Sequence, residues 1–213
     1  MSAYAPQSGV RFIVSHGVFQ HAYDICNPTG QAEFHVDVSH WTPGKADMTF
    51  HKGADSSHPI IGIAEFQHLS KDAELGLVDP SRPGGMERIP LPCDTFMTVQ
   101  YAFQVIFPGE HHRRTYTWKR TRSHGFGSQA LKLVDETGRV IAVYSAGGGL
   151  TSRTGQMDLY VNYGEKFQLI ALMSGLALQE KLHRSRKHGA AGVAGGSGGL
   201  FTAGAAGAAG AGS

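Results

Sequence analysis

Five basic residues lie within ten positions of one another, and their types are suited to binding an anionic ligand. They are Arg113, Arg114, Lys119, Arg120 and Arg122, and the aromatic residues Tyr116 and Trp118 lie among them. Guanidinium groups pair with phosphate oxygens in a bidentate fashion. Tyrosine and tryptophan favour the interface between lipid headgroups and water. The segment therefore predicts a binding site for a phosphate or an anionic lipid headgroup.

A β-strand is the element expected to position these side chains. With a period of two residues, one face of the strand carries Arg114, Tyr116, Trp118 and Arg120, and the other carries Arg113, Thr115, Thr117 and Lys119. The mixture of charged and aromatic residues on the first face favours an exterior or rim position. The alternative is a solvated strand whose arginine and aromatic side chains stack without binding any ligand.

A second basic cluster follows the main apolar segment near the C-terminus. Its members are Lys181, Arg184, Arg186 and Lys187. Cations at the end of a helix complement the helix dipole and cap its last carbonyls, so a structural role is expected. If this helix lies along the axis of a barrel, the cluster emerges at one mouth and adds to a positive patch facing anionic lipid.

The chain contains twelve histidines, a residue type that commonly ligates metal ions. The tightest groups are His35-Val36-Asp37 and His111-His112. Zinc sites need three or four converging ligands at defined spacing, and the chain contains no HExxH and no paired CxxC motif. We therefore expect no metal and no other cofactor. The His111-His112 pair is predicted to be solvated, and its partial protonation would strengthen the adjacent basic patch at mildly acidic pH.

Motifs for catalysis are missing as well. The glycine-rich segment 145–155 lacks the GxxxxGK[ST] spacing of a phosphate-binding loop, so it is predicted to be a loop between strands, with Arg153 available to a phosphate site. The chain has no GxSxG elbow and no cysteine–histidine signature. The sequence therefore indicates a protein that is not an enzyme, with no catalytic residues.

Residues 11–163 have the pattern of a β-protein. Short runs of Val, Ile, Phe, Tyr and Thr alternate with clusters of Gly, Pro and Asp. Alternating apolar residues in 31–38, 98–107 and 157–162 indicate antiparallel strands with one buried face. We predict about twelve strands, at 11–15, 19–25, 31–37, 46–51, 60–66, 75–79, 86–90, 96–107, 112–120, 128–135, 139–145 and 156–163.

One long helix is predicted at residues 166–182. Its apolar residues, between Phe167 and Leu178, cover every side of the helix, which is typical of a helix buried on all sides. The apolar run is shorter than the roughly 20 residues that span a bilayer. A barrel of about eleven strands can hold a central helix. The predicted fold is therefore mainly β, a closed antiparallel barrel of about 12 strands around a central hydrophobic C-terminal helix.

Composition defines the domain boundaries and the expected compartment. Residues 1–10 are predicted to be a disordered lead-in, 11–187 a single domain, and the Gly/Ala-rich residues 188–213 a disordered tail. The net charge of +2 is too small to imply nucleic acid. Cys26 and Cys93 form no motif, and the N-terminus has no signal peptide, which favours an intracellular protein, cytoplasmic or peripheral to a membrane.

Three segments carry a resemblance to a known family: 114–120, 131–144 and the helix 166–182. The chain resembles the tubby-like fold superfamily, which includes tubby domains, LURP-one-related proteins and phospholipid scramblases, and in particular its fungal members. The resemblance implies a roughly twelve-stranded barrel closed around a hydrophobic helix. Tubby domains bind phosphoinositides through a basic surface, but their ligand residues do not align with this chain one by one, so none is transferred.

The expected function is docking to anionic membrane lipid, such as phosphoinositide, or to a protein partner through the basic residues. Three alternatives remain open. The first is a carrier of lipocalin type, with a hollow barrel and the helix packed outside. The second is a scramblase-like lipid transporter, although the cysteine cluster and proline-rich leader of scramblases are missing here. The third is an enzyme with an unrecognised site in a barrel mouth. The sequence leaves the oligomeric state open.

Overall fold

The computed structural model describes most of the chain outside its two ends. The described residues are 9–16, 22–40, 42–67, 70–79, 81–82, 84–94, 100–107, 109–120, 130–145 and 154–194, with the backbone alone for 186–194. The chain divides into two compact units, Met1–Leu178 and Gln179–Ser213, and each unit is described by itself. The first unit contains all the strands.

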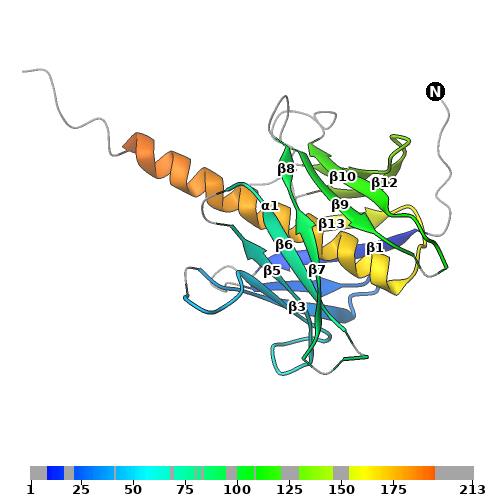
Figure 1. Ribbon diagram of the computed structural model, residues 1–213. Coiled ribbons are helices and arrows are strands. Elements are labelled where there is room, and N and C mark those ends of the chain that lie inside the picture. Colours follow the sequence, from blue (N-terminus) through cyan, green and yellow to red (C-terminus); the bar gives the residue numbers. More distant parts are fainter. Residues whose placement is uncertain are drawn as a thin grey trace, which may run out of the picture. The chain divides into compact units, whose positions relative to one another are not determined.

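The first unit is built on one antiparallel sheet, as Figure 1 shows. Within the described residues it has thirteen strands: β1 (Val10–His16), β2 (Ala22–Cys26), β3 (Ala32–Val38), β4 (Met48–His51), β5 (Ile60–Phe66), β6 (Ala73–Val78), β7 (Met86–Leu91), β8 (Cys93–Asp94), β9 (Gln100–Val105), β10 (Arg114–Arg120), β11 (Leu131–Val134), β12 (Val140–Ser145) and β13 (Thr154–Leu159). Parts of the strands predicted at 19–25, 96–107 and 128–135 lie outside the described residues.

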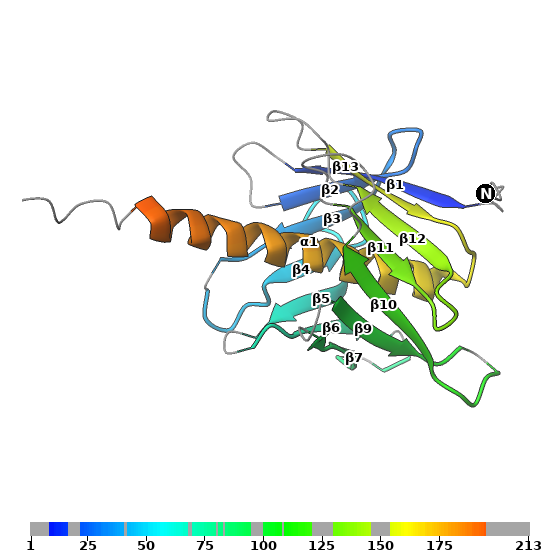
Figure 2. The same cartoon turned by 90° about the horizontal axis from the view of Figure 1, so that it is seen from above.

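Most neighbours in the sheet are also neighbours in the sequence. The strand order is β7-β6-β5-β4-β3-β2-β1-β13-β12-β11-β10-β9-β8, so the only non-sequential pairing among the described strands joins β1 to β13. That pair runs from Val10↔Leu159 to Ser15↔Thr154. The first and last strands thereby hold the two halves of the sheet together, as the view in Figure 2 shows.

The ends of the sheet meet at one bent strand. Only Pro92 separates β7, which pairs with β6, from β8, which pairs with β9. Proline has no N–H for a strand ladder, so Pro92 marks the point at which the strand changes partner. Its carbonyl oxygen accepts a hydrogen bond from Ala102 N at 3.4 Å. The barrel is nearly closed, and counting the bent strand once gives the dozen strands that the sequence predicts.

The alternating patterns in the sequence place the core correctly. On β3 the buried residues are Phe34, Val36 and Val38, and on β9 they are Tyr101, Phe103 and Val105. Met157, Leu159 and Val161 are buried in and beside β13. The opposite faces of these strands are half-buried or exposed. One face of the sheet therefore lines the interior of the barrel.

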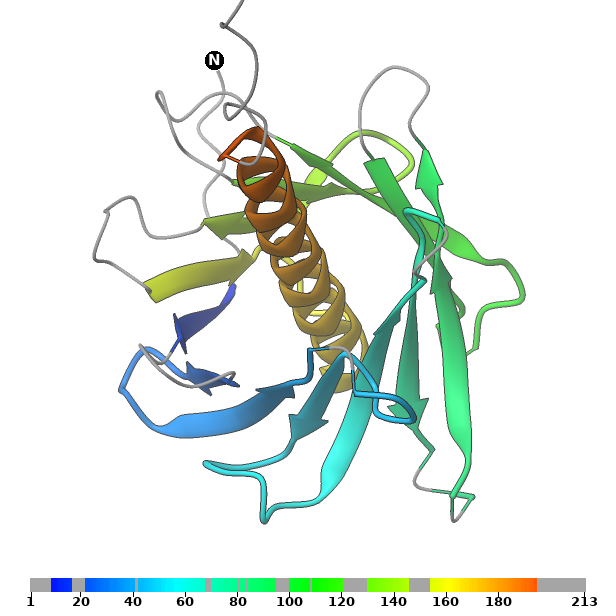
Figure 3. The ribbon, with the colours of Figure 1, turned by 90° about the vertical axis from the view of Figure 1, so that its left-hand side faces the viewer.

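The helix α1 (Glu165–Ala194) begins inside this sheet. In Figure 3 the strands surround the first part of α1, which belongs to the same unit. From Ile170 to Leu178 every residue is buried, and most have no exposed surface. A Cβ on Gly62 of β5 would lie 2.5 Å from Met173 Cε, and one on Gly175 would lie 3.0 Å from Trp118 Cζ2 of β10. The helix therefore packs closely against distant parts of the wall, which confirms the predicted central helix.

The helix extends further than the sequence analysis predicts. It ends at Ala194 rather than residue 182, so the predicted Gly/Ala tail is helical at residues 188–194. Alanine is the best helix former, and extending an existing helix avoids the cost of nucleation. Glycine content was therefore a poor guide to where this helix ends. The rest of the predicted tail, 195–213, lies outside the described residues, as do residues 1–8 of the lead-in.

Candidate functional site

A cavity of about 540 Å³ opens at the end of the barrel where α1 begins, and we call it the mouth cavity. Its apolar base comes from the wall and the helix: Phe12, Phe34, Ile61, Leu169 and Leu172. Its polar lining consists of Glu33, Lys52, Glu165 and Gln168. The helix starts directly after Gly164, whose φ of +90° favours glycine, and the Gly164 carbonyl accepts the Gln168 N–H at 3.1 Å.

The polar lining contains an ion pair between residues far apart in the sequence. Lys52 Nζ donates a hydrogen bond to Glu165 Oε1 at 2.8 Å and lies 5.1 Å from the centroid of the Phe34 ring. The hydrogen bond from Lys52, helped by its charge, lowers the pKa of the Glu165 carboxyl. Both side chains are exposed, so the pair contributes at most about 1 kcal/mol to stability. A ligand can therefore displace it at little cost.

Aromatic rings fill the space between the helix start and β10. The Phe167 ring centroid lies 4.8 Å from that of Tyr116, 5.2 Å from that of Tyr163 and 5.8 Å from that of Phe107. Burial, followed by the nearby Tyr163, raises the pKa of the Tyr116 hydroxyl to about 12. Tyr116 is therefore a neutral packing group, and rings fill the mouth on this side.

The structure corrects the expected orientation of β10. Tyr116 and Trp118 are each 1% exposed and point into the barrel, so they cannot lie at a headgroup interface. Trp118 Nε1 donates a hydrogen bond to Ser174 Oγ of α1 at 2.9 Å. The face shared by Arg114 and Arg120 is the interior face, and the two arginines occur only at its ends. A mixed face can thus be a buried face whose charged members lie at the barrel mouths.

The arginine at the start of β10 already has a carboxylate partner. Arg114 Nε donates to Glu110 Oε2 at 2.9 Å, and Arg114 Nη2 donates to Glu110 Oε1. The guanidinium carbon lies 5.3 Å from the centroid of the Phe107 ring. The hydrogen bonds that Arg114 donates to Glu110 raise the pKa of Arg114. Arg114 also lines a smaller cavity of about 180 Å³ together with the carboxylates of Asp135 and Glu136, so this cavity offers no net positive charge.

The predicted basic segment does not form one patch. Arg113 is exposed at one end of β10, and Lys119 and Arg120 lie at the other. About 20 Å of extended strand separates the two ends. Arg122 lies outside the described residues. In the second unit, Arg184 Nε donates to Glu180 Oε1 at 2.9 Å, Lys181 is half-buried, and the side chains of Arg186 and Lys187 are not described.

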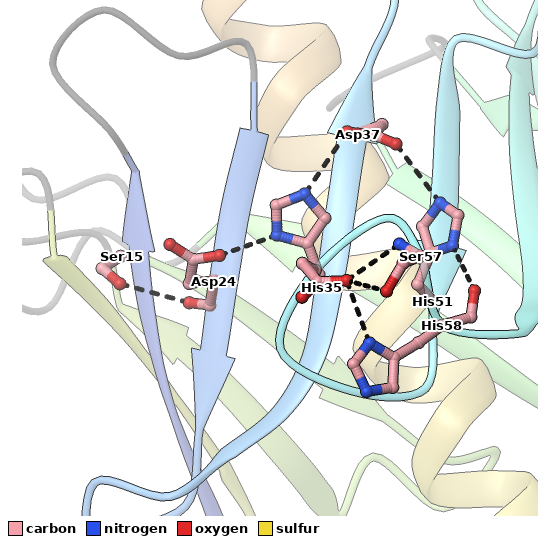
Figure 4. A network of polar contacts seen from close by, with 8 residues as sticks. Ser15, Asp24, His35, Asp37, His51, Ser57 and His58 are labelled. Carbon is pink, nitrogen blue, oxygen red and sulfur yellow. Dashed lines mark hydrogen bonds and ion pairs between the residues drawn. The ribbon is translucent and has the colours of Figure 1, made fainter.

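A network of histidines and carboxylates crosses the outer face of β2, β3 and β4, and Figure 4 shows its members. His35 Nδ1 lies 2.8 Å from Asp24 Oδ1, and His35 Nε2 lies 3.3 Å from Asp37 Oδ1. His51 Nε2 lies 3.2 Å from Asp37 Oδ2, without hydrogen-bond alignment. A neutral imidazole has one N–H, so His35 donates to both carboxylates only as an imidazolium. The network links three strands through side chains.

The loop after β4 is fastened to the same network. His51 Nδ1 lies 2.8 Å from the His58 carbonyl oxygen. Asp55 accepts hydrogen bonds from the Ser57 hydroxyl at 2.5 Å and the Ser57 N–H at 2.9 Å, and these bonds lower the pKa of Asp55 to about 2. The serine hydroxyl therefore donates to a carboxylate rather than to a histidine nitrogen, which is not the geometry of an activated nucleophile.

The network also lacks the geometry of a metal centre. Across the described ranges, no group of three or more His, Cys, Asp or Glu side chains is placed to hold a metal ion. His35 and Asp37, which form one of the two tight groups noted in the sequence, are members of the network. Over those same ranges, no helix combines the length and hydropathy that crossing a membrane requires.

Sequence reasoning missed the residues of the mouth cavity. Lys52 and Glu165 are 113 residues apart, and the apolar base joins β1, β3, β5 and α1. No local motif can reveal such a site, because its members meet only when the barrel closes. The one local signal was the change from polar to apolar residues at the helix start. Comparisons with protein-family models, curated proteins and solved structures give no match for this chain.

Proposed function

We propose that this protein is a non-enzymatic, tubby-like barrel that binds a small molecule with an apolar body in the mouth cavity. The observation that carries the proposal is the cavity itself, whose volume of about 540 Å³ lies in the range of small-molecule sites. The closed sheet around an apolar helix supports the tubby-like resemblance. The lipocalin-type alternative requires a hollow barrel with the helix packed outside, whereas here the mouth cavity lies beside a helix that occupies the interior.

The chemistry of the lining supports an apolar ligand body. Ile61 on the wall and Leu169 on the helix are the half-buried apolar residues of the lining, so a ligand inserted between them is covered on two sides. Burying about 200 Å² of apolar ligand surface contributes about 5 kcal/mol before the entropy cost of association. The charged groups at the opening then set the orientation of the ligand.

Narrowing the cavity with a larger side chain is expected to weaken binding. Leu169→Trp adds a large ring at a half-buried position of the lining. The affinity for the uncharged fluorescent probe N-phenylnaphthylamine should fall at least about tenfold, because the space for an apolar body is lost. The matched control is Val78→Trp, on an exposed position of β6 outside the lining, and it should leave the affinity unchanged. Equal binding by wild type and Leu169→Trp would contradict the proposal.

A second candidate function, docking to anionic lipid, rests on the connection between β9 and β10. Ile106 is 49% exposed there, and His111, His112 and Arg113 are exposed as well. Arg113 has no ion-pair partner within the part of the chain that the structure describes. An exposed apolar side chain beside an unpaired cation is suited to a membrane surface carrying negative charge.

Charge reversal at the two ends of β10 tests this second candidate. Arg113→Glu is expected to reduce flotation with phosphatidylserine or phosphoinositide liposomes about tenfold, since each basic residue near such a surface contributes about 1 kcal/mol. Arg120→Glu makes the same change at the far end of the strand and should have little effect. Flotation that is independent of anionic lipid, or lost equally in both variants, would exclude docking through this connection.

A further inference from the structure

The opening of the mouth cavity already holds an ammonium group. Lys52 Nζ is hydrogen-bonded to the Glu165 carboxylate at 2.8 Å and lies 5.1 Å from the centroid of the Phe34 ring. A carboxylate next to an aromatic ring face is a favourable environment for a cation, because the ring quadrupole and the negative charge act in the same direction. The native contacts therefore show which charge this opening stabilises.

The charges that line the cavity do not balance. Glu33 and Glu165 supply two carboxylates, and Lys52 supplies one ammonium. Glu165 is paired with Lys52, whereas Glu33 has no hydrogen-bond or ion-pair partner among the described residues. The remaining negative charge repels an anionic head group and attracts a cationic one. This imbalance argues against a fatty acid or a phosphate as the occupant.

The Lys52 ammonium can be displaced from its position beside Glu165. Its side chain is 52% exposed and that of Glu165 is 82% exposed, so the pair is weakened by solvent screening. The four-carbon stem of lysine lets the ammonium move into water while the backbone stays in place. An external ammonium attached to an apolar chain is therefore able to replace it, because only the external group brings apolar surface to bury.

On the basis of the proposed function, we infer that the ligand of the mouth cavity is a cationic amphiphile, a protonated primary amine on a single aliphatic chain. Its ammonium takes the place of that of Lys52 at Glu165 and beside the Phe34 ring. Its chain lies against Ile61 and Leu169, the half-buried apolar residues of the lining. Lys52 then acts as a tethered competitor that lowers the affinity for the amine.

Three compounds with the same chain and different head groups test the head-group preference. The assay measures how well dodecylamine, dodecanol and laurate displace N-phenylnaphthylamine from the full-length protein. It is run at neutral pH, with each compound below its micelle concentration. The amine is expected to bind at least about fivefold more tightly than the alcohol, from the ring and carboxylate contacts, and laurate should bind most weakly. Equal displacement by amine and alcohol, or strongest displacement by laurate, would overturn the inference.

Two substitutions at the opening should act in opposite directions. Lys52→Met frees Glu165 and is expected to tighten amine binding about fivefold, whereas Glu165→Gln should weaken it about fivefold. Dodecanol carries no charge, so in both variants its affinity should change less than that of the amine. Both positions are exposed, so the melting temperature should shift by only a few degrees. An amine affinity that is unchanged in both variants would also overturn the inference.

The outcomes separate this inference from the function on which it rests. If the neutral probe and dodecanol bind to the wild-type protein and Leu169→Trp loses that binding, the cavity binds apolar molecules whatever the head-group comparison gives. If neither binds, the proposed function itself is wrong. Amine binding that survives Leu169→Trp would locate the amine elsewhere and remove the inference alone.

Discussion

Leu176→Asp is expected to lower the free energy of unfolding by at least about 4 kcal/mol. Leu176 has no exposed surface and lies in the stretch of α1 from Ile170 to Leu178, in which every residue is buried. Removing a buried leucine side chain costs about 2–5 kcal/mol, and the new carboxyl group has to be buried as well. A domain of ordinary stability has about 5–15 kcal/mol in total, so this variant should be largely unfolded or close to it.

Urea denaturation followed by circular dichroism measures this effect. Leu176→Ala should remain folded and lose about 2–5 kcal/mol, which gives a measurable variant if the aspartate protein does not fold. The matched control is Ser185→Asp, an exposed position on the same helix, which should change stability by no more than about 0.5 kcal/mol. A melting temperature for Leu176→Asp equal to that of wild type would mean that α1 is not enclosed.

The enclosed helix could be predicted from the sequence because the apolar residues of both the strands and the helix formed clear patterns. Alternation in 31–38 and 98–107 identified strands with one apolar face, and the helix had no polar side between Phe167 and Leu178. A helix that is apolar all round needs a wall on every side, and only the strands were available to form it. The same reasoning could not find the bend at Pro92, because a change of partner within one strand leaves the alternation intact.

Alternation separates two faces of a strand without showing which is interior, and this limited the prediction for β10. The arginines at positions 114 and 120 made its buried face look like a surface. In a barrel, the ends of an interior face lie at the mouths, where charged groups reach water or a partner such as Glu110. Tyr116 and Trp118 were therefore better indicators of the interior than the arginines were of the exterior.

Ser174→Ala is expected to destabilise the protein by about 1–3 kcal/mol, although alanine is the better helix former. Trp118 Nε1–H donates to Ser174 Oγ at 2.9 Å, and the two residues are at most 1% exposed. Without the hydroxyl group, the indole N–H loses its acceptor in a site closed to water, and an unsatisfied buried donor costs about that amount. The helix propensity gained, about 0.5 kcal/mol, is smaller and opposite in sign.

The loss of stability expected for Ser174→Ala is informative because the same substitution at a control position is expected to have the opposite effect or none. Ser185→Ala removes a hydroxyl from the exposed part of the same helix, where Ser185 Oγ donates to the Lys181 carbonyl at 3.0 Å. That variant should be neutral or slightly more stable, because only the propensity changes. If both alanine variants are stabilised equally, the indole N–H does not depend on Ser174.

A double-mutant cycle with Trp118→Phe isolates the hydrogen bond from the packing of the ring. Trp118→Phe removes the donor, and Ser174 Oγ keeps its second hydrogen bond, to the Ala171 carbonyl at 3.1 Å. With phenylalanine at position 118, Ser174→Ala leaves no orphaned donor, so its cost should fall by about 1–2 kcal/mol. That coupling links the wall to the central helix, since Trp118 belongs to β10 and Ser174 to α1. Purely additive effects would mean that the hydrogen bond between Trp118 and Ser174 contributes no measurable coupling between the wall and the helix.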